Sequence, residues 1–143
     1  MCIRDRVYTA YAGNGEFRQS TLIRGQATRE PVQVTKPATA AAVRNMLELA
    51  MGPRGTGRAA AVDGYRVGGK TGTARKQIGR TYAANKYRAS FVGMAPMSDP
   101  QVIVAVMIDE PSAGSYYGGT VAGPVFSGVV GGTMQLLGVP PDA

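Results

Sequence analysis

Residues 64–75 read Gly-Tyr-Arg-Val-Gly-Gly-Lys-Thr-Gly-Thr-Ala-Arg, and this stretch fits two unrelated motifs. Read from Gly64, it is G-x-x-x-x-G-K-T, a phosphate-binding loop that ends in Lys70 and Thr71 and opens a helix. Read from Lys70, it is K-T-G-T, a tetrad that requires an extended strand. The two motifs demand opposite local structures, so the flanking residues decide the fold.

The flanks favour the strand. A phosphate loop needs an apolar strand before it and a helix that starts at the Lys-Thr pair, because amides and the helix dipole must face the phosphates. Residues 59–63 (AAAVD) form a weak strand, and residues 72–79 contain two glycines and no helical periodicity. Residues 102–110 (VIVAVMIDE) nevertheless imitate the acidic strand that accompanies such loops. A P-loop ATPase-like nucleotide-binding site therefore remains an alternative.

The composition is that of a globular domain, with 143 residues of which 44% are hydrophobic. The chain has no histidine, which excludes a Ser-His-Asp triad, a Cys-His pair and a histidine-ligated metal site within it. Its one cysteine, Cys2, cannot form an internal disulfide. No uninterrupted run reaches the roughly 18 apolar residues that span a membrane. We expect neither a metal nor an organic cofactor.

Positive charge is concentrated in the middle of the chain. The formal net charge is +7, from 16 Lys or Arg and 9 Asp or Glu. Residues 54–88 hold nine of the basic side chains and a single acid, Asp63. This segment favours an anionic ligand, although a solvated basic face would look the same. No basic helix or RNA-binding signature accompanies it, so we expect no nucleic-acid partner.

Periodicity predicts helices and strands in alternation. Helical spacing predicts a helix over 39–51 and another that ends before Gly138. Residues 7–12 look like the end of a helix, which Gly13 caps. Strands or extended segments are expected over 17–23, 30–34, 65–74, 89–95 and 102–108. The last of these reads as a fully buried central strand, and residues 96–100 suit a hairpin connection that makes the last two strands antiparallel.

The last helix has one predicted apolar face and several glycines. The face comprises Val121, Val125, Phe126, Val129, Val130, Met134 and Leu137. The glycines are Gly123, Gly128, Gly131 and Gly132. We expect these glycines to permit close packing of the helix on a sheet.

The K-T-G-T tetrad has a chemical interpretation as the wall of a cleft. A strand at a cleft can pair its backbone with an extended peptide, and Gly72 would let that peptide approach closely. Lys70 offers positive charge, and Thr71 and Thr73 offer hydroxyl groups to a carboxylate. The amide of Thr73 is placed to donate to a developing oxyanion.

Five stretches in fixed order identify a family resemblance. They are GYRVGGKTGTARK (64–76), YRASFVGMAP (87–96), VIVAVMIDEP (102–111), YYGGTVAGPVF (116–126) and LLGVPPD (136–142). With them, residues 7–143 resemble the C-terminal part of the transpeptidase domain of a class B penicillin-binding protein, especially of the division type. The resemblance implies an α+β fold, with an antiparallel sheet packed between helices and the K-T-G strand as one wall of the cleft.

The resemblance also implies roles for individual residues. The catalytic residues would be Lys70 and Thr73. The substrate-binding residues would be Thr71, Gly72, Arg75, Tyr87, Tyr116 and Tyr117, with no metal. Tyr116 and Tyr117 could equally serve only to cover the sheet edge before the last helix. The implied ligands are the D-Ala-D-Ala ends of peptidoglycan stem peptides and β-lactam antibiotics.

The family's nucleophile motif, Ser-x-x-Lys, and its Ser-x-Asn motif do not occur in these 143 residues. We therefore expect the chain to be a fragment that is inactive alone. The parent would cross-link septal peptidoglycan on the outer side of the cytoplasmic membrane, beside membrane proteins of the divisome. Residues 1–6 read as a non-native leader before residues 7–143. A peptidoglycan-binding module without chemistry remains a further alternative.

Overall fold

The computed structural model describes residues 3–26 and 29–143 of the chain. Residues 1 and 2, which belong to the predicted leader and include Cys2, lie outside the described residues. Helix α1 (Ile3–Ala12) ends where the sequence predicts. The amide of Gly15 donates to the carbonyl oxygen of Ala10 at 2.8 Å, and Gly15 has a left-handed φ of 86°. This glycine conformation turns the chain away from the helix axis.

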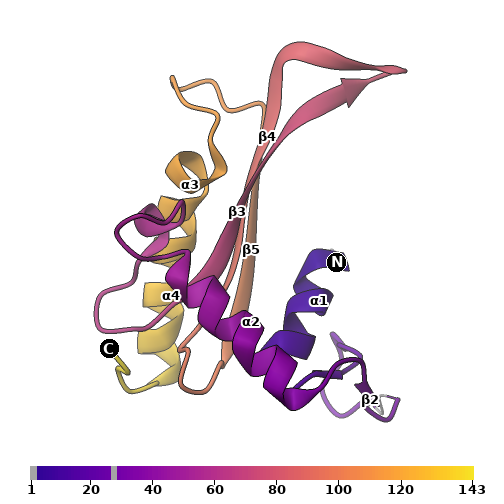
Figure 1. The fold of residues 1–143 in the computed structure, drawn as a ribbon, viewed down its shortest axis with the longest axis vertical. Coiled ribbons are helices and arrows are strands. Elements are labelled where there is room, and N and C mark those ends of the chain that lie inside the picture. The colour runs from indigo at the N-terminus through magenta and orange to yellow at the C-terminus, as the bar shows by residue number, and fades with distance from the viewer. Residues whose placement is uncertain (1–2, 27–28) are drawn as a thin grey trace.

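A three-stranded antiparallel sheet runs along the molecule (Figure 1). Its strands lie in the order β3 (Gly68–Ile78), β4 (Thr81–Ala95) and β5 (Val102–Asp109). Residues 96–100 connect β4 to β5, which confirms the predicted hairpin. The predicted extended segment at 65–74 is confirmed as β3, which begins three residues later and continues four residues further.

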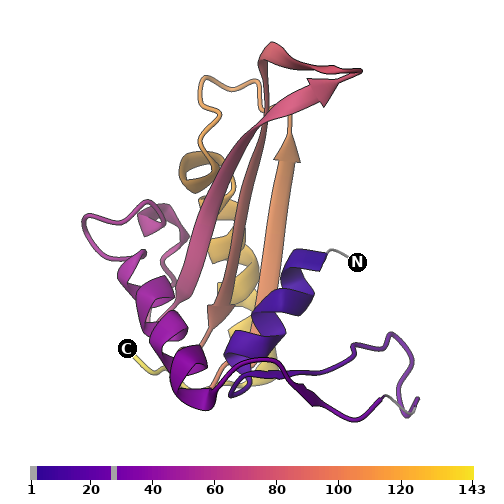
Figure 2. The same ribbon diagram turned by 45° about the vertical axis from the view of Figure 1, so that its right-hand side comes forward.

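Helices cover both faces of this sheet, so the predicted α+β fold is confirmed. Helix α4 (Gly123–Leu137), preceded by the single turn α3 (Gly118–Val121), packs on one face, and α1 lies on the opposite face (Figure 2). Helix α2 (Pro37–Leu49) confirms the helix predicted at 39–51 and packs beside β3. Among the described residues, no helix is long and apolar enough to cross a membrane.

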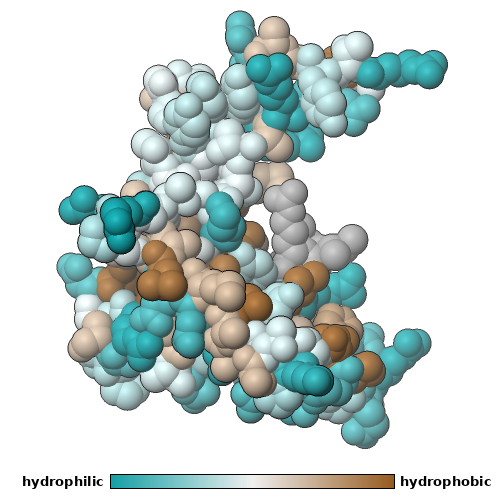
Figure 3. All heavy atoms as spheres, in the orientation of Figure 1, coloured by the Kyte–Doolittle hydropathy of each residue, from teal (hydrophilic) through white to brown (hydrophobic). Residues whose placement is uncertain are grey.

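The core lies between β4 and α4. The rings of Phe91 and Phe126 are 4.8 Å apart and tilted by 58°, and both side chains are fully buried. Met94, Val130 and Met134 complete the set of large fully buried side chains. Figure 3 shows hydrophobic side chains gathered over the helices, whereas the far end of the β3–β4 hairpin is mostly hydrophilic. Packing therefore stabilises the near half of the sheet more than its far end.

The predicted apolar face of the last helix is only partly buried. Phe126, Val130 and Met134 have no exposed surface, but Val125 and Val129 are 45% and 47% exposed. The buried residues follow a strict spacing of four, which places one narrow stripe on the sheet. The wider predicted face is therefore wrong at Val125, Val129 and Leu137, which is also exposed.

The glycines of α4 also differ from the prediction. A Cβ at Gly123 would lie 3.2 Å from the backbone of Ala59, next to the 3₁₀ turn η1 (Arg58–Ala60). A Cβ at Gly128 or Gly132 would meet open space. Close packing is thus confined to Gly123 and is directed at η1, so the expected packing of these glycines on the sheet is wrong.

Within residues 3–26 and 29–143, strand β5 has a strand partner on one side only and is half-exposed, so the prediction of a fully buried central strand is wrong for this chain. Val104 and Val106 pack against the core on the α4 side. Met107, which points to the other face, is 54% exposed. The continuous apolar run at 102–108 suggested that other elements cover both faces of β5. On the face opposite α4, α1 contacts only part of the strand.

The two early strands exist but are shorter than predicted. They are β1 (Glu16–Phe17) and β2 (Val32–Gln33), which pair antiparallel. The hydroxyl of Thr21 donates to the side chain of Gln26 at 2.6 Å, so the chain folds on itself where the first strand was expected to continue. Residues 27 and 28 lie outside the described residues.

The carboxylate of Asp142 ties the C-terminal segment to the region that precedes β3. Its oxygens accept the amide of Arg66 at 2.7 Å and the amide of Ser98 at 3.0 Å. Burial opposes the charge on this group, but the two amide donors outweigh it and hold the pKa of Asp142 below its ordinary value of 3.8.

We expect Asp142→Asn to lower the free energy of unfolding by about 1 kcal/mol at neutral pH, because one oxygen and the charge are lost. A pKa lowered in the folded state contributes stability above the unfolded pKa, and that stability disappears as the pH falls through the folded pKa. Urea denaturation should therefore show a difference at neutral pH that vanishes in strong acid. The control is Asp99→Asn, because the Asp99 carboxylate accepts a hydrogen bond from Gln101 within its own turn. An equal loss in both variants would contradict this role.

Candidate functional site

Lys70 and Thr71 lie inside β3, where they pair with Val92 and Phe91 of β4. No helix starts at these residues, so the backbone cannot form the phosphate cradle that the first motif requires. The phosphate-loop interpretation is therefore wrong. The acidic end of residues 102–110, which imitated the partner strand of a phosphate loop, has a different role, because Asp109 and Glu110 form ion pairs with Lys76.

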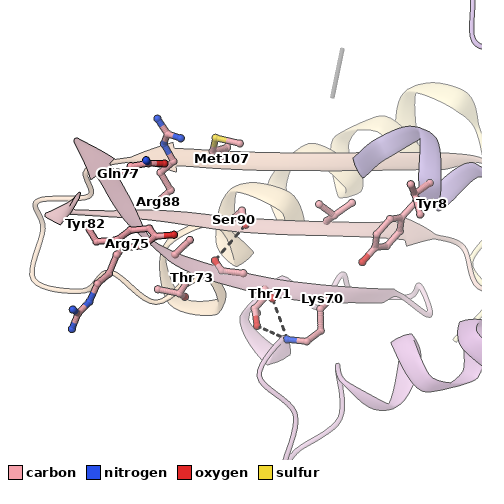
Figure 4. A pocket seen from close by; sticks show the side chains of 14 residues that line it. Tyr8, Lys70, Thr71, Thr73, Arg75, Gln77, Tyr82, Arg88, Ser90 and Met107 are labelled. Carbon is pink, nitrogen blue, oxygen red and sulfur yellow. Dashed lines mark hydrogen bonds between the residues drawn. The ribbon is translucent and has the colours of Figure 1, made fainter. Parts of the chain in front are cut away.

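The polar groups of the tetrad are held in place by hydrogen bonds (Figure 4). The amine of Lys70 donates to the carbonyl oxygen and to the hydroxyl oxygen of Thr71, at 3.1 and 3.2 Å. The same hydroxyl lies 3.1 Å from the hydroxyl of Thr56. The hydroxyl oxygen of Thr73 accepts the amide of Gly118 at 2.9 Å. A cation and two oriented hydroxyl groups thus line one exposed strand.

Gly72 leaves room for the hydroxyl group of Ser90. A Cβ at this position would lie 2.5 Å from the hydroxyl oxygen of Ser90, which donates to the carbonyl oxygen of Gly72 at 3.3 Å. A Cβ at Gly118 would clash with the carbonyl oxygens of Gly72 and Ser90. Gly118 therefore allows the segment after β5 to lie directly against β3 and β4.

A cavity of about 640 Å³ opens beside the tetrad, between α1 and the strands β3 and β4. Of the predicted site residues, those on β3 line it, namely Lys70, Thr71, Gly72, Thr73 and Arg75. Tyr8 of α1 and Ser90 of β4 contribute to the other walls (Figure 4). In the part of the chain that the structure describes, β3 has a strand partner on one edge only. Its free edge can accept an extended peptide.

The three predicted tyrosines form one aromatic cluster. The rings of Tyr87 and Tyr116 stack at 4.1 Å, and those of Tyr116 and Tyr117 lie 4.6 Å apart. The hydroxyl of Tyr116 hydrogen-bonds to that of Tyr117, which raises the pKa of Tyr116 above its ordinary value of 10. Arg75 is the strand partner of Tyr87. Because Gly118 binds Thr73, the cluster adjoins the tetrad rather than standing apart from it.

Much of the expected positive charge is neutralised inside the chain. Arg66 pairs with Glu48 at 2.7 Å. Lys76, Lys86 and Arg88 pair with Asp109 or Glu110. Within residues 3–26 and 29–143, neither Lys70 nor Arg75 forms an ion pair. Arg54, Arg58 and Arg80 take part in none of these ion pairs either, so five cations of the segment stay unpaired among the described residues. Of these five, Lys70 and Arg75 line the cavity, so the expected anion site narrows to them.

Sequence reasoning missed Thr56, Ser90 and Gly118. The sequence could have indicated Ser90, because the register of the predicted hairpin places it opposite Gly72. Thr56 lies in the loop after α2 and carried no motif, so nothing in the sequence pointed to it. Among the described residues, no cluster of three or more acidic, cysteine or histidine side chains could hold a metal ion.

Comparison with known proteins agrees with this arrangement. The family model described as the penicillin binding protein transpeptidase domain matches residues 6–131. The "Probable peptidoglycan D,D-transpeptidase PenA" of Neisseria gonorrhoeae is 46% identical over 136 residues, which cover 95% of this chain and 23% of that protein. The "Peptidoglycan D,D-transpeptidase FtsI" of Escherichia coli is 36% identical over 138 residues, or 96% of this chain and 24% of that protein.

A solved structure extends the likeness to the fold. The apo transpeptidase domain of Burkholderia pseudomallei penicillin-binding protein 3 matches with a TM-score of 0.83 and 51% identity, over 97% of this chain and 43% of that one. The chain thus spans about a quarter of the length of the curated relatives that it matches. With the strand-borne K-T-G-T tetrad, the antiparallel sheet and a family match over most of its length, this chain belongs to the penicillin-binding protein transpeptidase domain family.

Proposed function

We propose that this chain supplies the K-T-G-T wall of a peptidoglycan D,D-transpeptidase. The observation that carries the proposal is the free edge of β3 beside Lys70, Thr71 and Thr73. An extended peptide pairs with that edge, its terminal carboxylate binds the two hydroxyl groups, and Lys70 supplies the counter-charge. The amide of Thr73 stabilises the oxyanion that forms on the attacked carbonyl.

The ligands are the D-Ala-D-Ala end of a stem peptide and β-lactams that imitate it. Gly72 belongs to the wall, and Arg75, Tyr87, Tyr116 and Tyr117 bind the remainder of the ligand at the far end of the groove. The nucleophilic serine comes from a Ser-x-x-Lys segment outside these 143 residues, because none occurs within them. Serine attack forms an acyl-enzyme and releases the terminal D-Ala, and an amine then takes the acyl group.

The parent protein acts in septal wall synthesis, with its catalytic domain on the outer side of the cytoplasmic membrane and divisome membrane proteins as partners. The match to FtsI and the division-type sequence pattern support this assignment. Residues 1–6 remain a predicted leader.

A hybrid protein tests the function, with residues 7–143 in place of the matching segment of the N. gonorrhoeae PenA protein. Intact-mass spectrometry after incubation with benzylpenicillin should show one covalent adduct on the hybrid and on PenA, and none on this chain alone. An adduct on the chain alone would place the nucleophile within it and contradict the proposal. A folded hybrid that binds D-Ala-D-Ala peptides but gains no adduct would instead establish a non-catalytic peptidoglycan-binding module.

A further inference from the structure

The pairing of β3 with β4 is interrupted next to the aromatic cluster. From Gly68 to Arg75 the register is continuous, and Arg75 faces Tyr87. The next pair is Gln77 with Tyr82, so the single residue Lys76 stands opposite four residues of β4 (83–86). An interrupted ladder loses backbone hydrogen bonds, so other contacts must hold the strands at this point.

Lys76 makes those contacts across the sheet. Its amine donates to Asp109 at 2.5 Å and to Glu110 at 2.7 Å, both at the end of β5. Arg88 and Lys86 bind the same two carboxylates, at 3.1 and 2.9 Å. The Lys76 side chain is 20% exposed, against 48% for that of Lys86. Lys76 lies toward the far end of the β3–β4 hairpin, and that end is mostly hydrophilic in Figure 3.

Glu110 connects this cluster to the groove. Its φ is 51°, a left-handed conformation that a glutamate adopts only when its surroundings hold it there. In this conformation its amide donates to the carbonyl oxygen of Tyr87 at 2.9 Å, and Tyr87 stacks on Tyr116. Residues 111–117, which carry Tyr116, begin directly after it.

We propose that Lys76 is a positioning residue, which holds Glu110 and through it Tyr87, Tyr116 and Arg75 in the geometry that receives the ligand. The inference rests on the proposed function. The contacts form a continuous path from Lys76 to Glu110, from Glu110 to Tyr87 and from Tyr87 to Tyr116. Hydrogen bonds from Lys76 lower the pKa of both carboxyl groups, so the cluster stays charged at neutral pH.

Lys76→Met tests this inference, with Arg80→Met as the control, because Arg80 lies in the turn between β3 and β4 and forms no ion pair among the described residues. In the hybrid, Lys76→Met should weaken the noncovalent binding of a β-lactam about tenfold, which corresponds to roughly 1.4 kcal/mol. The acylation rate constant of the bound complex should change little, because the affected residues lie away from the reacting carbonyl. Lys76→Arg should restore binding, and Arg80→Met should leave it unchanged.

Amide exchange in the whole 143-residue chain gives a readout that does not depend on acylation. The amide of Glu110 should exchange faster in Lys76→Met and at the original rate in Lys76→Arg. Equal binding and exchange in Lys76→Met and the unchanged chain would overturn the inference, as would an equal loss in Arg80→Met. If the unsubstituted hybrid takes no β-lactam, the proposed function fails, whereas the exchange result still decides whether Lys76 orders Glu110.

Discussion

Replacing Lys70 by alanine is expected to lower β-lactam acylation of the hybrid by about 10²–10³-fold, the range seen when one preorganised polar group is removed from an acyl-transfer site. The amine of Lys70 lies at hydrogen-bonding distance from two oxygens of Thr71. Its loss removes the nearest counter-charge for the ligand carboxylate and a donor that orients the Thr71 hydroxyl.

The measurement is the second-order rate constant of acylation by a chromogenic cephalosporin. Arg80→Ala is the control, because it removes a basic side chain from the turn of the same hairpin, away from the residues that line the cavity. Lys70→Arg should recover little, since a planar guanidinium does not reproduce the compact ammonium group at the strand edge. If the Lys70→Ala hybrid reacts as fast as the unchanged hybrid, Lys70 does not take part in acylation.

Phe126→Ala is expected to cost about 3–5 kcal/mol of folding free energy, the range for truncating a buried aromatic side chain. Phe126 has no exposed surface, and its ring packs against Phe91 in the contact that joins α4 to β4. A loss of this size approaches the whole stability of many domains, so the variant should be largely unfolded at moderate urea concentrations.

Leu136→Ala provides the comparison on the same helix. Leu136 is 91% exposed, so its truncation should change the free energy of unfolding by no more than about 0.5 kcal/mol. Urea denaturation followed by far-ultraviolet circular dichroism measures both variants. Similar losses at the two positions would contradict the placement of the core between α4 and β4.

The central sheet was predictable from local signals. The apolar run at 102–108, the turn residues at 96–100 and the alternation at 89–95 fix an antiparallel hairpin without knowledge of the rest of the fold. Burial was less predictable, because an apolar run reports what a strand can bury and not what covers it. Strand β5 therefore appeared central in the sequence but has one strand partner among the described residues.

The residues of the candidate site were also predictable only in part. Lys70, Thr71, Gly72 and Thr73 are contiguous, so a motif identifies them together. The stack of Tyr87 on Tyr116 joins residues 29 positions apart, and only the five-stretch resemblance indicated that they share a groove. Thr56 and the path from Lys76 to Glu110 depend on loop conformation and on an irregular register. No short-range pattern encodes such contacts, so they become visible only in three dimensions.

The central claim is that this chain forms one wall of a transpeptidase site whose nucleophile lies outside residues 1–143. The most direct measurement is the nucleotide sequence upstream of the codon for Val7, read from the source material. The account predicts an open frame that encodes Ser-x-x-Lys followed by Ser-x-Asn before Val7. A frame that closes upstream of Met1 without these motifs would contradict it.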